Sequence, residues 1–162
     1  MRSKVNFPIR KLPRLSKYNY SSGGYYFITI CTHNKSNLFY YADNLNKMGK
    51  IAKAELENIP LRFEDVSVDK YVVMPNHIHC IMVIECGAKA ERSRPFPTLS
   101  TVIGLYKSGV SRQIHKLHPT IKVWQKSFHD HIIRNEEDYL SIWQYIDDNP
   151  TKWDDDEYFI KT

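Results

Sequence analysis

The sequence predicts one α+β domain, a sandwich of the ferredoxin-like kind in which helices pack on an antiparallel sheet. Its 162 residues suit one compact domain and are too few for two ordinary ones. Strand-like and helix-like segments follow one another in the order β-α-β-β-α-β. Only Met74, Pro75 and Asn76 separate the two middle strands, so we expect these strands to form a tight antiparallel pair.

The first half of the chain contains one strand, one helix and the strand pair. The segment "YYFITICT" at 25–32 follows the turn signal "SSGG" and is rich in aromatic and β-branched residues, which predicts a strand. Apolar residues then recur at helical spacing from Leu45 to Ile59, and Pro60 closes this predicted helix. The paired strands are predicted at 66–73 and 77–84.

The second half of the chain begins with a surface loop at 86–97 and contains two helices. One or two strands are predicted within 121–133. The last helix is predicted to begin with Asn135 as its N-cap and to end at Pro150, and its acidic first turn suits the helix dipole. The clearest helical stripe follows "PFPT" and consists of Leu99, Val102, Ile103, Tyr106, Val110 and Ile114.

Charge is distributed unevenly along the chain. The formal net charge is +5 and the sequence pI is about 9.0, which favours an anionic partner. We divide the chain into a basic arm at 1–20, a single domain at 21–153 and an acidic tail at 154–162. A solvated face is the alternative explanation of a charge run. The basic residues of the arm are Arg2, Lys4, Arg10, Lys11, Arg14 and Lys17.

The cysteines and the apolar segments indicate an intracellular protein. The chain has 3 cysteines, widely spaced and without a CxxC pair, which argues against a disulfide framework and a zinc knuckle. They are expected to be thiols in a reducing compartment. No signal peptide and no membrane-spanning apolar run is evident. We therefore expect a cytoplasmic location and no membrane partner.

His77 and His79 stand two positions apart in the second strand of the pair. Residues at that spacing point to the same face of a strand, so the two imidazoles can converge on one ligand. Both faces of the strand are largely apolar, and buried imidazoles in a purely packing role would need hydrogen-bond partners. Two imidazoles suit Zn, Mn, Fe or Cu, and with oxygen ligands also Mg. The pair alone does not decide between these metals.

Tyr145 and Asn149 lie on the last helix, in the segment "SIWQYIDDNP". A separation of four residues places Asn149 directly above Tyr145, on the flank of the apolar stripe. The alternative is a boundary tyrosine followed by an asparagine that ends the helix before proline. A phenol is a weak nucleophile unless a cation stabilises its phenolate, so the pair gains chemical meaning only beside a metal.

Four blocks of the sequence resemble the REP-associated tyrosine transposases, relatives of the single-tyrosine insertion-sequence transposases. The blocks are "FITICTHNK", "VVMPNHIHCIMVI", "WQKSFHDHIIR" and "YIDDNPTKW", and the resemblance spans about 10–153. It implies a fold of the HUH-endonuclease type, so that the domain at 21–153 is catalytic. It also implies that His77 and His79 hold a divalent ion, Mg or Mn, that Asn149 is its third ligand and that Tyr145 is the nucleophile.

The chemistry that this resemblance implies is cleavage and rejoining of single-stranded DNA at hairpins through a 5′-phosphotyrosine link. Such a link conserves the energy of the broken bond, and no glycine-rich phosphate loop is present, so no nucleotide cofactor is expected. A DNA-hairpin-binding regulator with little or no cleavage activity is the alternative function. Related insertion-sequence enzymes form dimers with the tyrosine supplied in trans, whereas REP-associated members can work alone, which leaves a monomer or a homodimer open.

Further residues are expected around this site or on the DNA. His33, His129 and His131 are expected to orient the site or contact phosphate rather than to bind the metal. Gln125 can contact a base. The basic arm is expected to contact the DNA backbone, together with Lys107 and Arg112, which lie off the apolar stripe of the helix that follows "PFPT".

Overall fold

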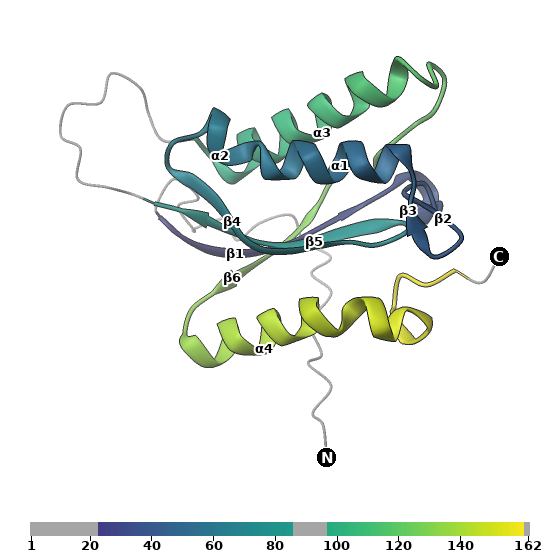
Figure 1. The fold of residues 1–162 in the computed structure, drawn as a ribbon. Helices are drawn as coiled ribbons and strands as arrows, with labels where there is room; N and C mark the ends of the chain where they lie inside the picture. Colours follow the sequence, from purple (N-terminus) through teal and green to yellow (C-terminus); the bar gives the residue numbers. More distant parts are fainter. Residues whose placement is uncertain (1–22, 86–96, 161–162) are drawn as a thin grey trace.

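A four-stranded antiparallel sheet forms the centre of the structure, and helices cover both of its faces (Figure 1). The computed structural model describes residues 23–85 and 97–160. The strand order β4-β5-β1-β6 is the split βαβ arrangement of a ferredoxin-like sandwich, which confirms the predicted fold class. The strands are β1 (Gly24–Cys31), β4 (Val66–Val73), β5 (His77–Ile84) and β6 (His129–Ile133).

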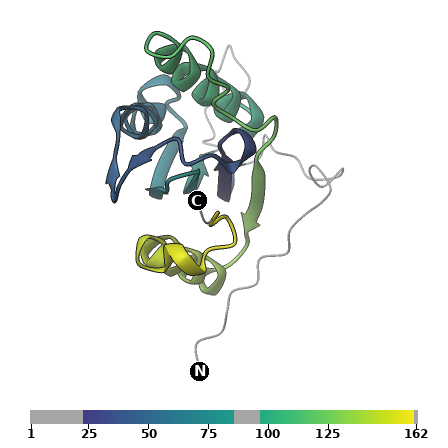
Figure 2. The same ribbon diagram turned by 90° about the vertical axis from the view of Figure 1, so that its right-hand side faces the viewer.

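The helices form one layer on each face of the sheet. Three of them lie together on one face, and α4 lies alone on the opposite face (Figures 1 and 2). Side chains alternate along β5, so that Ile78, Cys80 and Met82 belong to the larger core beneath α1 and α3. The intervening positions face α4. The helices are α1 (Lys47–Glu57), α2 (Ile59–Arg62), α3 (Leu99–His115) and α4 (Glu136–Asp148).

The predicted strand pair and the two long predicted helices of the second half are present. The bounds of β4 and β5 are those predicted, and every residue of β5 is buried. Asn135 caps α4, because its Oδ1 accepts a hydrogen bond of 2.8 Å from the amide of Asp138. The strand predicted within 121–133 is confined to β6, and the part before it contributes only an isolated bridge between Thr32 and Trp124.

The helix predicted from Leu45 differs from the structure at both ends. It begins at Lys47, because Asn46 accepts a hydrogen bond of 3.0 Å from the amide of Gly49. Leu45 belongs instead to a small hairpin, β2 (Tyr40–Tyr41) with β3 (Asn44–Leu45). Pro60 follows the end of α1, as predicted, but it also lies in the first turn of α2, where its fixed φ suits the helix.

Polar and aromatic contacts on the edge strand β4 fix the position of α4. The ammonium of Lys70 lies 2.6 Å from Asp147 and 3.7 Å from the centre of the Trp143 ring. The Tyr139 hydroxyl donates a hydrogen bond to Asp69. Beneath the helix, Phe27, Ile81, Ile142 and Ile146 form a second, smaller core. Leu140, an apolar residue of the same helix, is 57% exposed.

The chain beyond α4 turns back toward the sheet (Figures 1 and 2). It forms a 3₁₀ turn over Asn149–Asp155 and then contacts the end of β5 that carries the histidines. The basic arm and the loop at 86–96 lie outside the described residues, so the DNA-binding role expected of the arm stays a prediction. None of the helices in 23–85 or 97–160 is both long and apolar enough to span a membrane.

Candidate active site

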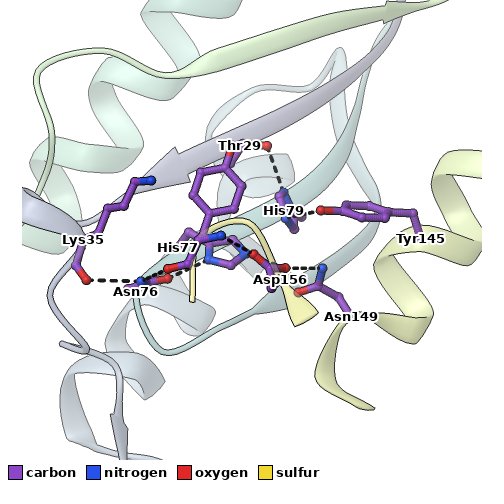
Figure 3. Close-up of polar contacts among 9 residues, drawn as sticks. Thr29, Lys35, Asn76, His77, His79, Tyr145, Asn149 and Asp156 are labelled. Carbon is purple, nitrogen blue, oxygen red and sulfur yellow. Dashed lines mark hydrogen bonds and ion pairs between the residues drawn. The ribbon is translucent and has the colours of Figure 1, made fainter. Parts of the chain in front are cut away.

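The histidine pair lies on the face of the sheet that α4 covers. His77 is 0% exposed and His79 is 1% exposed, and the centres of their rings are 4.4 Å apart (Figure 3). Cys31 and Thr29 stand opposite them on β1, in the register that places all four side chains on one face. The predicted convergence of the two imidazoles is therefore present in the structure.

One nitrogen of each ring is held by a neighbouring side chain. The Thr29 hydroxyl lies 2.8 Å from Nδ1 of His79, and the side-chain oxygen of Asn76 lies 2.8 Å from Nδ1 of His77. These contacts orient each ring so that its Nε2 points into the space beneath α4. Asn76 is itself fixed, because its amide donates to the carbonyls of Lys35 and Tyr158 at 3.1 and 2.6 Å.

Tyr145 reaches the same space from α4. Its hydroxyl lies 3.4 Å from Nε2 of His79 (Figure 3). Its ring packs edge-on against Phe27 at 6.0 Å, and the ring of Phe27 stacks in turn on His79. Helix and sheet thus hold the phenol beside the histidine pair.

Asn149 and Asp156 complete the cluster from the chain that follows α4. The Asn149 amide donates to Oδ2 of Asp156 at 2.9 Å, and the same carboxylate oxygen lies 3.9 Å from Nε2 of His77. Ligand atoms of His77, His79 and Asp156 all lie within 4.8 Å of one another, so this group can hold a metal ion. It is the only such group of histidine, cysteine or acidic side chains within 23–85 and 97–160.

Two polar atoms of this cluster are buried without a hydrogen-bond partner. They are Nε2 of His77 and Oδ1 of Asn149. A buried polar atom without a partner costs about 1–3 kcal/mol, and both atoms are lone-pair donors suited to a cation. The residues present therefore fit a divalent ion bound between β5 and the end of α4.

The pKa shifts around the cluster share one physical cause. Burial lowers the pKa of His79 to about 3 and places that of His77 well below its ordinary value, so both imidazoles are neutral and able to coordinate. Burial, with the carboxylates of Asp156 and Glu157, raises the pKa of Tyr145. Burial also raises the pKa of Asp156. A divalent cation would lower the pKa values of Tyr145 and Asp156 again, because it stabilises the phenolate and the carboxylate.

Aromatic rings of the C-terminal segment cover the histidines. The ring centre of Tyr158 lies 4.6 Å from that of His77, and the ring of Trp153 lies 5.9 Å from it. The ammonium of Lys35 lies 5.0 Å from the centre of the Tyr158 ring. This cover explains why both histidines are inaccessible to solvent in this conformation.

The other predicted residues lie at varied distances from the cluster. His131 bonds Asp138 of α4 at 2.8 Å. Lys107 donates to the carbonyls of Gln125 and Ser127 at 2.6 and 3.3 Å, so its ammonium is engaged within the protein. Arg112, also on α3, belongs to the layer on the far side of the sheet (Figure 1). His33 and the exposed His129 are not among the ligand atoms that converge.

Sequence reasoning missed three residues of this site, Thr29, Asn76 and Asp156. Asn76 was assigned only to the break between the strands, although it holds both His77 and the C-terminal segment. Thr29 could have been found from strand register, because it is the cross-strand partner of His79. Asp156 stands within the run "DDDE", where nothing in the local pattern separates a buried carboxylate from its exposed neighbours.

Comparisons with known sequences connect this site to a family. No model of a known protein family matches the chain. An uncharacterized protein of Haemophilus influenzae is 37% identical over 99% of both chains. A putative REP-associated tyrosine transposase of the same organism is 28% identical over 83% of this chain and 74% of its own. The REP-associated tyrosine transposase of Escherichia coli is 26% identical over 85% of this chain and 74% of its own.

Solved structures share the fold. A REP-associated tyrosine transposase bound to a REP hairpin superposes with a TM-score of 0.59 at 22% identity, over 88% of this chain and 74% of that one. A putative transposase from Deinococcus radiodurans superposes with a TM-score of 0.52 at 16% identity, over 85% of this chain and 97% of that one. These comparisons, together with a histidine pair and a helix tyrosine that meet in one site, show that the chain is similar to the REP-associated tyrosine transposases.

Proposed function

We propose that this protein is a metal-dependent transposase that cleaves and rejoins single-stranded DNA at hairpin ends. The observation that carries the proposal is the Tyr145 hydroxyl, held 3.4 Å from Nε2 of a buried histidine pair whose other Nε2 has no partner. A nucleophile and a set of metal-ligating atoms thus share one space. Family members named for REP sequences, and the relative bound to a REP hairpin, support the substrate class.

In the proposed reaction Tyr145 is the nucleophile. Its oxygen attacks the scissile phosphorus, the bond from phosphorus to the 3′ oxygen breaks, and the phenol loses its proton. The DNA on one side gains a free 3′-OH, and the other side stays attached as a 5′-phosphotyrosine. A 3′-OH then attacks that phosphorus and releases the tyrosine, so the number of phosphodiester bonds is conserved and no nucleotide cofactor enters. Phe27 and His79 hold the ring in place for both steps.

We propose His77, His79 and Asn149 as ligands of the divalent ion, Mg or Mn. The unpaired atoms of His77 and Asn149 support this assignment. The ion, when bound, polarises the phosphate and stabilises the phenolate. Because the Tyr145 hydroxyl approaches His79 of its own chain, the arrangement supports a monomer that acts in cis. A homodimer that exchanges its helices is the other possibility within the family.

A hairpin-binding regulator with little cleavage activity is the second candidate. The observation that favours it is the cover over the histidines, since Trp153 and Tyr158 leave His77 0% exposed. The two candidates differ in one measurable property. Both bind a hairpin, but only a transposase forms a covalent adduct with the DNA.

Metal removal tests the proposed function directly. A hairpin oligonucleotide with a flanking single strand, labelled on the 3′ side of the scissile bond, is incubated with the protein and Mn or Mg. We expect a labelled protein–DNA adduct on a denaturing gel, and its complete loss when a chelator is present, because the buried phenol is otherwise protonated. Binding without any adduct in either metal would favour the regulator. An adduct that persists in chelator would contradict the metal requirement.

The hydroxyl of Thr29 should matter for metal affinity although it is not expected to touch the ion. Thr29→Val keeps the shape of the side chain and removes the partner of His79 Nδ1 at 2.8 Å. We expect Mn affinity to fall by about 10- to 100-fold, because the ring loses the contact that orients it. The fall is measured by titration of the Mn signal in electron paramagnetic resonance. Thr120→Val, in an exposed turn after α3, is the control, and equal affinity in both variants would refute this role.

A further inference from the structure

We infer that Asp156 is an anionic ligand of the same metal ion, so that the segment after α4 is part of the active site. The inference rests on the proposed function, because it concerns the ion proposed there. It adds a carboxylate from a segment that the sequence places in an acidic tail. It also gives that segment a metal-dependent attachment to β5.

The position of the carboxylate is the first support. Its side chain is only 2% exposed, although Asp154 and Asp155 beside it and Glu157 after it are exposed. Its Oδ2 lies 3.9 Å from Nε2 of His77, which is too long for a hydrogen bond. Two donor atoms that share one ion, each bound at about 2.0–2.3 Å, tolerate such a separation. The carboxylate thus faces the histidine pair without bonding to it.

The hydrogen bonds of Asp156 are the second support. The amide of Asn149 donates to Oδ2 at 2.9 Å, and the backbone amide of Tyr158 donates to Oδ1 at 2.7 Å. A carboxylate has about four lone-pair sites, so two donors orient it and leave lone pairs for a cation. The bond to Asn149 links it to a residue that we already propose as a ligand.

Charge balance is the third support. Within 23–85 and 97–160, the Asp156 carboxylate lies 3.9 Å from the ring of His77, and the Lys35 ammonium acts on it from farther away. Burying a carboxylate is costly, and a divalent ion between Asp156 and the histidines would reduce that cost. Two imidazole nitrogens, one amide oxygen and one carboxylate oxygen then form a mixed nitrogen and oxygen donor set suited to Mn²⁺.

The segment has contacts that do not depend on the carboxylate. The Tyr158 carbonyl accepts a hydrogen bond of 2.6 Å from Asn76, and the rings of Trp153 and Tyr158 pack on His77. Asp156→Asn keeps the size of the side chain and one of its two acceptor oxygens, so it removes the negative charge and one of the bonds from Asn149 and the Tyr158 amide. The contacts of Trp153 and Tyr158 are expected to keep the segment in place.

The test compares Asp156→Asn with Asp155→Asn in the full chain. The neighbour Asp155 is exposed, so its substitution makes the same change in net charge away from the ligand atoms. Mn²⁺ binding is measured by electron paramagnetic resonance in the absence of DNA. We expect the affinity of Asp156→Asn to fall at least about tenfold and that of Asp155→Asn to stay within about twofold of the unsubstituted protein.

Hydrogen exchange provides a second readout. In the unsubstituted protein, Mn²⁺ should slow exchange of the Tyr158 amide, which bonds Asp156, and this protection should be absent in Asp156→Asn. Equal or tighter Mn²⁺ binding by Asp156→Asn would overturn the inference and leave the proposed function standing. If the unsubstituted protein bound no Mn²⁺, both the inference and the proposed metal would fail.

Discussion

Replacing His77 with alanine should abolish metal-dependent cleavage while hairpin binding survives. The substitution removes an imidazole whose Nε2 is buried, unpaired and within 4.8 Å of the other ligand atoms. Loss of a metal ligand should reduce cleavage by more than about 100-fold. Removing a residue that only orients a ligand already reduces metal affinity or activity by about 10- to 100-fold. Hairpin affinity should stay within about threefold, because phosphate contacts elsewhere supply most of it. Cleavage is followed on the gel and binding by fluorescence anisotropy.

A matched control separates the metal site from the general effect of removing a histidine. His118 is exposed after α3, and His118→Ala should leave both cleavage and binding unchanged. Loss of binding in His77→Ala, together with a lowered melting temperature, would show that the residue acts through the fold. Full cleavage by His77→Ala at ordinary Mn concentration would remove the residue from the metal site.

The sheet and its histidine pair could be predicted from the sequence because local signals define them. Strands β4 and β5 are rich in β-branched and apolar residues and are separated by a short break, and alternation alone places His77 and His79 on one face. Asn135 was recognisable as an N-cap because its acidic first turn follows directly. The resemblance of four blocks then connected this strand with Tyr145, which lies on a different element and far along the chain.

Contacts that depend on tertiary structure could not be predicted in the same way. Lys107 has the appearance of a surface cation on a helix, but the chain before β6 brings carbonyl oxygens to its ammonium. Leu140 is an apolar residue of α4, yet the helix packs over β4 and β5 and leaves that position in solvent. The burial of Asp156 depends on how the chain turns after α4, and hydrophobic periodicity carries no information about that turn.

Tyr145→Phe should eliminate the covalent protein–DNA adduct and leave the fold almost unchanged. The substitution removes one oxygen and keeps the ring that packs on Phe27 and His79. The contact of the hydroxyl with His79 is long, at 3.4 Å, so its loss should change the free energy of unfolding by about 1 kcal/mol. Without a nucleophilic oxygen the adduct should decrease by more than about 1,000-fold, beyond detection on the gel.

Two further tyrosines serve as controls because each is a possible nucleophile. Tyr139 lies on the same helix and donates to Asp69, whereas Tyr158 packs on His77. Tyr139→Phe should form the adduct at normal yield. An adduct that persists in Tyr145→Phe and disappears in Tyr158→Phe would assign the nucleophile to the C-terminal segment.

Asn149→Ala should lose cleavage but recover part of it at high Mn concentration. A missing ligand weakens metal binding, which more metal can offset, whereas a missing nucleophile cannot be replaced by metal.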